Sequence, residues 1–224
     1  MGQTESWWQQ ITGEAIVGEY TGTQLKVLPA ALVSWQDFKE SYPDASVLSR
    51  DTGFPRNYSR PPYPGYDSGS DRPFMFYGEL DDTLPAMERI VGLNIGETAV
   101  AYPFPLFEDS PVINDSVEDT DIVIFYAPET LSPFLGMFGS ENPVVGSTGV
   151  YDPNLDGRKL AFKSESYAIV DEQTGSTWNI FGEAIEGPLA GSVLNPVVHA
   201  NHFWFAWRVF YPDTLIRSAD EVDN

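Results

Sequence analysis

The two histidines of the chain are the first residues whose type and spacing suggest chemistry. His199 and His202 are three residues apart, and two imidazoles at this spacing on a helix can bind one metal ion. No third metal ligand is evident in the neighbouring sequence. We therefore expect ordinary, partly buried histidines, and we keep His199 and His202 as the candidate metal residues. No cofactor is evident from the sequence.

Carboxylates offer a second kind of chemistry. Asp171 and Glu172 with Glu183, or Asn114 with Asp115, could serve as general acid and base or bind calcium. However, 33 of the 224 residues are Asp or Glu, so acidic neighbours are common by chance. Residues 152–157 resemble the start of a calcium loop, but Lys163 stands where the twelfth-position Glu is due. A hairpin turn is the better interpretation of this stretch.

Composition excludes several classes of function. The chain has no cysteine, which rules out disulfides, thiolate catalysis and cysteine-bound metals. No phosphate-binding loop, dinucleotide fingerprint or serine nucleophile elbow is present. The net charge is −21 with only 12 Lys and Arg, so nucleic acids and anionic membrane surfaces are poor partners.

The same acidity suggests where the protein works. A charge of −21 repels itself at ordinary salt, and molar salt screens that repulsion. Few lysines and many carboxylates favour a protein adapted to high salt, as in halophiles, over an ordinary acidic protein. We find no transmembrane run of about 18 apolar residues and no signal peptide. We therefore expect a soluble protein, either cytoplasmic or an exported domain that lacks its signal.

The elements that would position these residues are mainly short strands. An alternating pattern predicts a hairpin over 90–102, and apolar runs predict strands over 112–117, 122–126 and 167–170. Helices should be few and short. Ser34 could cap one, with Trp35 at its start. The expected fold class is mainly β with a few short helices.

An internal repeat organises the chain. Residues 13–49 align with residues 182–218 without a gap, and about a third of the positions are identical. Both copies begin Gly-Glu-Ala-Ile, and Trp35 aligns with Trp204. We expect two pseudo-repeated lobes, divided as the back half of a first unit (1–49), a Pro- and Tyr-rich ordered loop or linker (50–85), a complete second unit (86–217) and an acidic tail (218–224).

Several motifs resemble domain-of-unknown-function family 3179. The motifs that carry the resemblance are Thr4-Glu5-Ser6-x-Trp8, Leu28-Pro29, Tyr42-Pro43-Asp44, Asp51-Thr52-Gly53-Phe54, Arg89-x-Val91-Gly92-Leu93, Ala101-Tyr102-Pro103, Val112-Ile113-Asn114-Asp115, Asp171-Glu172-Gln173-Thr174-Gly175-Ser176-x-Trp178 and Gly182-Glu183-Ala184-Ile185-x-Gly187-Pro188-Leu189-Ala190-Gly191.

The resemblance implies a missing N-terminal unit but no reaction. Members of the family carry Trp-His-Glu and Tyr-Cys-Pro-x-Cys-Gly motifs, where this chain has Asp109-Ser110-Pro111 and Tyr126-Ala127-Pro128-Glu129-Thr130. Histidine and cysteine would suit soft-metal or redox chemistry, which this chain has lost or which an absent half carries. The candidate ligand-binding residues are Asn114, Asp115, Tyr126, Asp171, Thr174, Trp178 and Glu183.

Our leading hypothesis is a binding or structural module adapted to high salt. One alternative is a subunit or remnant of a metal-dependent or redox enzyme. Another is a carbohydrate-binding module that uses Trp7, Trp8, Trp178 or Trp204, if these are exposed. The incomplete first unit should leave an unpaired sheet edge and exposed apolar surface. We therefore expect self-association, or pairing with the missing unit or with a partner chain.

Overall fold

The structure is a computed structural model that describes residues 4–58, 72–132 and 143–222. It is mainly β, with two short α-helices, as expected. The helices are α1 (Trp35–Ser41) and α2 (Trp204–Phe210), and η1 (Phe104–Phe107) is a 3-10 turn.

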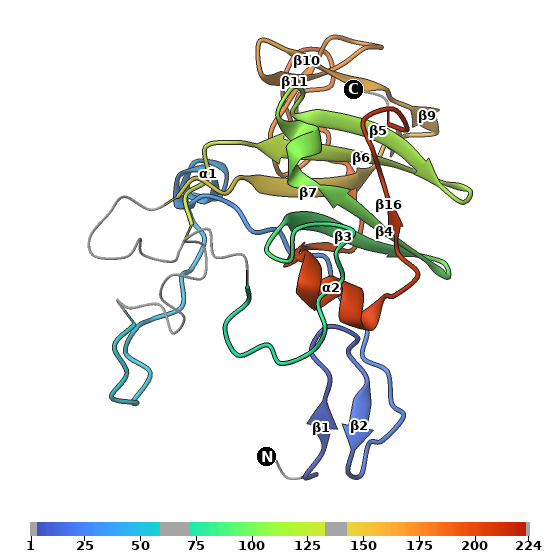
Figure 1. Ribbon diagram of the computed structural model, residues 1–224. Helices are drawn as coiled ribbons and strands as arrows, with labels where there is room; N and C mark the ends of the chain where they lie inside the picture. The colour runs from blue at the N-terminus through green and yellow to red at the C-terminus, as the bar shows by residue number, and fades with distance from the viewer. Residues whose placement is uncertain (1–3, 59–71, 133–142, 223–224) are drawn as a thin grey trace.

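Two four-stranded sheets form the centre of the molecule (Figure 1). The first has the order β15-β3-β4-β16 and the second β14-β7-β6-β5. The strands of these sheets are β3 (Arg89–Ile95), β4 (Thr98–Pro103), β5 (Val112–Val117), β6 (Thr120–Ala127), β7 (Ser147–Asp152), β14 (Asn195–Pro196), β15 (His199–Phe203) and β16 (Leu215–Ile216).

The main core lies between these two sheets. Leu93 and Tyr102 from the first sheet pack with Ile113 and Ile124 from the second, and all four are buried. Alternating side chains make this possible, because every second residue of a strand points to the same face. The last described residue, Val222, is also buried in this cluster, so the acidic tail that begins at 218 contributes to the core.

A third sheet covers the far side of the second sheet. It has the order β10-β11-β12-β13, with β10 (Phe162–Glu165), β11 (Ala168–Asp171), β12 (Thr177–Trp178) and β13 (Ala184–Glu186). Phe125 and Phe162 meet edge to face, with ring centroids 5.1 Å apart. A small hairpin of β8 (Asn154–Leu155) and β9 (Arg158–Lys159) confirms the turn expected over 152–157.

Helix α2 covers the outer face of the first sheet, below β3 and β4 in Figure 1. Trp204 and Trp207 of α2 pack against Ile90 and Ala101. Gly92 allows this close approach, since a Cβ on Gly92 would lie 2.6 Å from the ring of Trp207. The hairpin predicted over 90–102 is the β3–β4 pair.

The N-terminal segment is arranged differently. β1 (Trp7–Trp8) and β2 (Ala15–Val17) form a two-stranded sheet that projects below α2 in Figure 1. Residues 24–34 then lead to α1, where the Ser34 side chain accepts a hydrogen bond from the Asp37 amide, as the cap prediction requires. Of the linker predicted over 50–85, residues 59–71 lie outside the described residues.

Candidate functional site

Asp171 is the centre of a buried polar network. β11 ends at this residue, and a turn leads from it to β12. Its carboxylate accepts hydrogen bonds from the amide of Thr174 (2.7 Å), the amide of Ser176 (3.1 Å) and Nε1 of Trp178 (3.1 Å). Three of the candidate ligand-binding residues, Asp171, Thr174 and Trp178, are thus brought together.

This network fixes a turn rather than leaving groups free for a ligand. Burial raises the pKa of Asp171, but hydrogen bonds from Trp178 and Thr174 outweigh it and leave that pKa below its ordinary value. The residue is therefore ionised at neutral pH. Asp171 and Trp178 are buried, and the contacts of the carboxylate are all internal. Its chemical role here is to hold β11, the turn and β12 in register.

Glu183 joins the loop between β12 and β13 to the residue that follows α1. Its Oε2 accepts a hydrogen bond from Nδ2 of Asn179 (3.0 Å), and its Oε1 accepts one from the hydroxyl of Tyr42 (3.0 Å). The ring of Tyr42 also meets Phe181 edge to face, at 5.1 Å between centroids. Burial and the nearby Glu183 raise the pKa of Tyr42, so its hydroxyl keeps the proton that it donates.

Asn114 and Asp115 are neighbours on β5 and point to opposite faces, as alternation requires. The side chain of Asn114 donates to the carbonyl of Phe162 (2.7 Å) and accepts from its amide (2.9 Å). This pair of bonds attaches β10 to β5. The structure therefore does not bring Asn114 into one site with Asp115.

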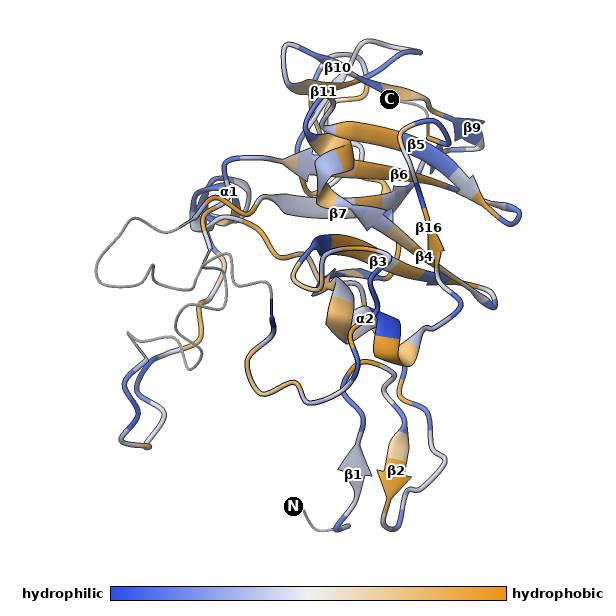
Figure 2. Cartoon of the chain, in the orientation of Figure 1, coloured by the Kyte–Doolittle hydropathy of each residue, from blue (hydrophilic) through white to orange (hydrophobic). Residues whose placement is uncertain are grey.

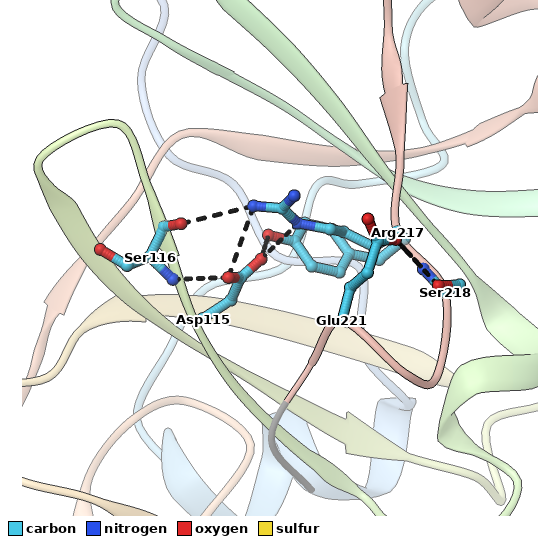
Figure 3. A network of polar contacts seen from close by, with 6 residues as sticks. Asp115, Ser116, Arg217, Ser218 and Glu221 are labelled. Atoms are coloured by element: carbon cyan, nitrogen blue, oxygen red, sulfur yellow. Dashed lines mark hydrogen bonds and ion pairs between the residues drawn. The ribbon is translucent and has the colours of Figure 1, made fainter.

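Asp115 holds the C-terminal segment against the hairpin β5–β6 (Figure 3). Its Oδ2 accepts from Nε of Arg217 (2.7 Å) and from the hydroxyl of Tyr102 (2.6 Å). Burial lowers the pKa of Arg217, but Asp115 more than compensates, and the net shift is upward. The Asp115 side chain is only 9% exposed, which makes this ion pair a structural contact.

Tyr126 lies apart from the other candidates. Its ring stacks on Phe107, with centroids 5.0 Å apart, and meets Phe104 edge to face at 5.7 Å. Burial raises the pKa of its hydroxyl. Tyr126 therefore belongs to the aromatic packing of η1 against β6.

The two histidines are placed on a strand, and the structure does not bring them together. His199 and His202 are three residues apart on β15, which puts their side chains on opposite faces. Nδ1 of His199 lies 3.0 Å from the carbonyl of Val197, whereas the ring of His202 packs on Trp207 at 5.2 Å. Burial lowers the pKa of both. Within the described ranges no group of three or more metal-ligating side chains occurs.

A shallow hollow of about 370 Å³ lies at the end of α2. Glu97, Thr98, Tyr211 and Asp213 line it together with apolar side chains. None of the nine candidate residues named from the sequence lies in its wall. No helix in the described part of the chain is long and apolar enough to cross a membrane.

The tryptophans considered for carbohydrate binding differ in exposure. Trp178 and Trp204 are buried, whereas 58% of Trp7 is exposed. Stacking on a sugar needs an exposed ring face, so the two buried tryptophans do not meet that condition.

Sequence reasoning also missed Asp81, which accepts a hydrogen bond from Nε1 of Trp204 and pairs with Arg208 at 3.0 Å. No sequence signal distinguishes Asp81 from the other acidic residues.

A run of exposed apolar side chains lies on residues 25–35, which we call the N-terminal apolar segment. It carries five exposed large apolar side chains: Leu25, Val27, Leu28, Leu32 and Trp35. Trp35 is 55% exposed, whereas its aligned residue Trp204 is 0% exposed. Leu25 is 51% exposed and its aligned residue Leu194 only 1%. Figure 2 shows that apolar residues also form β2, which projects away from the sheets.

Comparison with known proteins places the chain by family. No curated protein and no solved structure matches it. Residues 2–214 match a family described as protein of unknown function (DUF3179). Because the match spans most of the sequence, the chain belongs to the DUF3179 family.

Proposed function

We propose that the protein is a non-catalytic binding module that docks a partner protein on its N-terminal apolar segment. In this proposal residues 4–49 are a duplicate of residues 174–218. The second copy is covered by the sheets of its own chain, and the first copy offers the same kind of surface to a partner.

Local structure supports the equivalence of the two copies. The amide of Gly22 bonds to the carbonyl of Ala15 at 2.8 Å, and the amide of Gly191 bonds to the carbonyl of Ala184 at the same distance. The amide of Leu25 bonds to the carbonyl of Gly13 at 2.9 Å, as that of Leu194 does to Gly182.

The helices extend the agreement. α1 and α2 both begin at the aligned tryptophan and have the same length. The residues that follow them are Tyr42 and Tyr211, whose φ angle is −128° in both copies. Equal local geometry at aligned positions is what a duplicated unit would retain.

The difference in burial of Trp35 and Trp204 carries the proposal. Both start a helix, yet one is 55% exposed and the other 0%. Fully burying a large apolar side chain stabilises a protein by about 1.5–3 kcal/mol. Covering Trp35, Leu25 and Leu32 therefore offers several kcal/mol toward association. Contiguous exposed apolar surface of this kind is typical of protein interaction sites.

The polar candidates favour a binding role over a catalytic one. Asp171, Asp115 and Glu183 all have their carboxylates engaged by neighbouring side chains or amides. A catalytic carboxylate needs access to a substrate proton. The internal use of these groups is what a structural framework requires.

Salt adaptation is the second part of the proposal. The net charge of −21 favours a salt-rich environment, where the Debye length falls to about 3 Å at 1 M. Hydrophobic docking suits that environment, because salt does not screen it as it screens charge pairing.

Photo-crosslinking tests the docking proposal. A photoreactive amino acid at position 32 should give a discrete crosslinked product in the producing cell at its natural salt. The same amino acid at position 185 is the matched control, since Ile185 is 55% exposed and Leu32 52%. A product from position 32 with twice the mass of the chain would identify self-association. Absence of any product specific to position 32 would refute the docking surface.

A further inference from the structure

We propose that the partner binds by strand addition. Residues 26–34 pair with the free edge of an antiparallel strand pair in the partner. The same strand pair carries a carboxylate that contacts the indole N–H of Trp35 and the ammonium group of Lys39. This inference rests on the proposed function and specifies the chemistry of the partner. It comes from the way the chain covers its own second copy.

In the second copy, the strand that precedes the helix is paired. β15 runs antiparallel to β3, with Ala200 opposite Gly92 and Phe203 opposite Arg89. The pairing continues into the helix start, where the amide of Trp204 bonds to the carbonyl of Glu88 at 2.8 Å. Trp204 is buried against Ile90 of β3 and Ala101 of β4.

In the first copy, the aligned residues 26–34 have no such partner. Ala30 to Ser34 align with β15, and they have neither strand nor helix assignment. Among the described residues, no backbone–backbone hydrogen bond involves residues 26–33. A segment without backbone pairing beside exposed apolar side chains is the kind of surface that recruits an added strand.

A cation–aromatic pair is repeated in both copies. Nζ of Lys39 lies 5.5 Å from the ring centroid of Trp35, and the guanidinium of Arg208 lies 5.7 Å from that of Trp204. In the second copy Asp81 completes the group, since its carboxylate accepts from Nε1 of Trp204 (3.0 Å) and Nε of Arg208 (3.0 Å).

The first copy has the cation and the ring, and the described residues give Lys39 no ion pair. A partner that carries a carboxylate in the place of Asp81 would form an ion pair with Lys39 and accept a hydrogen bond from the indole N–H of Trp35. A charge pair across the interface also selects this partner over a merely apolar one.

Packing defines a further requirement. Phe38 aligns with Trp207, whose ring lies on Gly92. The partner strand should therefore have glycine or another small residue opposite Phe38, flanked by apolar residues that cover Trp35.

β3 of a second copy does not offer the required edge, because it has β15 on one side and β4 on the other. The occupant that we propose is a sheet with a free edge in another protein. A homodimer formed through an edge strand such as β5 or β16 is an outcome that the experiments can detect.

A synthetic peptide of residues 79–103 is the probe, because it contains Asp81 and the β3–β4 hairpin. We expect it to bind the full-length protein and to slow hydrogen–deuterium exchange of the amides of residues 30–34. Lys39→Asp should weaken binding about tenfold. A peptide with Asp81→Lys should restore the affinity of that variant.

Proline substitutions test strand pairing itself. Neighbouring N–H groups of a strand point in opposite directions, so only one of Ala31→Pro and Leu32→Pro should remove a pairing hydrogen bond and weaken binding about tenfold. The exchange rates of β3 and β4 amides should stay unchanged and serve as the control for folding.

The outcomes separate the two proposals. Strand addition is supported if the peptide binds and only one of the two proline variants weakens that binding. It also requires that Lys39→Asp weakens binding and that the Asp81→Lys peptide restores it. Four results would overturn it: equal effects of both proline variants, no effect of the charge reversal at Lys39, slower hydrogen–deuterium exchange of the protein only in residues 86–103, or no peptide binding. In those cases crosslinking from position 32 would still decide whether the apolar segment docks a partner or a second copy.

Discussion

The hydroxyl of Tyr42 donates a hydrogen bond to Oε1 of Glu183, and the two oxygen atoms lie 3.0 Å apart. Tyr42 follows α1, and Glu183 lies in the loop between β12 and β13. A related contact occurs at the other end of the molecule, where Ile11 packs against the cluster that contains Trp204 and Trp207. α1 thus lies beside the loop between β12 and β13, and α2 lies beside the loop between β1 and β2.

Tyr42→Phe should loosen α1 without unfolding the sheets. It removes one side-chain hydrogen bond, which is worth about 0.5–1.5 kcal/mol, while the ring contact with Phe181 remains. We expect faster hydrogen–deuterium exchange of the α1 amides and unchanged exchange in β5 and β6. Tyr77→Phe is the control, because 89% of Tyr77 is exposed. Equal exchange in the two variants would show that the Tyr42 contact does not anchor the helix.

Asp171→Ala should destabilise the whole protein. The change leaves the indole N–H of Trp178 and the amides of Thr174 and Ser176 without their acceptor. Buried donors without partners cost about 1–3 kcal/mol each, so we expect a loss of roughly 2–5 kcal/mol in the free energy of unfolding.

Urea denaturation followed by near-ultraviolet circular dichroism measures the effect of Asp171→Ala. Glu172→Ala is the matched control in the same turn, since Glu172 is exposed. A loss no larger than that of the control would mean that water replaces the carboxylate.

Asp81 links stability to acid pH. Its hydrogen bond with the side chain of Thr83, followed by those with Trp204 and Arg208, lowers the pKa of Asp81 from 3.8 to about 2. A carboxylate with a depressed native pKa stabilises the fold above its unfolded pKa. That contribution is lost as the pH falls from about 4 to about 2.

Asp81→Asn tests this linkage. The variant should lose roughly 1–3 kcal/mol at neutral pH, and its free energy of unfolding should fall less steeply between pH 4 and pH 2. Asp82→Asn, at an exposed neighbouring position, should behave like the wild type. Parallel acid profiles for Asp81→Asn and the wild type would contradict the assignment.

Much of the fold followed from periodicity and turn residues. The β3–β4 hairpin, β5 and β6 are confirmed because alternation and apolar runs are local properties of the sequence. The cap at Ser34 is confirmed for the same reason. The order of strands in the three sheets depends on contacts between distant residues, which no local pattern specifies.

The candidate site was less predictable. Asp171, Thr174 and Trp178 belong to one sequence motif, and a turn brings their side chains together within a few residues. The contacts of Asp81 with Trp204 and of Tyr42 with Glu183 span the chain and left no signal. The histidine pair illustrates the opposite case: its spacing suits a helix, but pairing with β3 makes the segment a strand.

His199 should make stability sensitive to mild acid. Burial lowers its pKa below the ordinary 6.5, although contacts with the carbonyls of Val197 and Thr148 oppose this shift. Below pH 6.5 the unfolded chain therefore takes up a proton before the folded chain does. The free energy of unfolding should therefore decrease as the pH is lowered below 6.5, by at most about 1.4 kcal/mol per pH unit for one group.

His199→Gln keeps a side-chain donor and removes this titration. Its free energy of unfolding should change less between pH 6.5 and pH 5 than that of the wild type. His202→Gln should show a similar flattening, because burial also lowers the pKa of His202. Identical slopes for the wild type and both variants would show that neither histidine is buried neutral in solution.

Salt should stabilise the protein through its net charge of −21. Raising NaCl from about 0.1 to 1 M shortens the Debye length from about 10 to 3 Å, and the melting temperature should rise by roughly 2–4 °C for each kcal/mol of repulsion that is screened. Salt also strengthens hydrophobic burial, so a charge-reduced variant is needed to separate the two effects.

We would replace four exposed carboxylates by their amides, at Glu19, Asp44, Asp82 and Glu129. This variant should be more stable than the wild type at low salt and should gain less from added NaCl. If both proteins gained equally, screening of the acidic surface would not be the cause, and the adaptation to high salt would lose its physical basis.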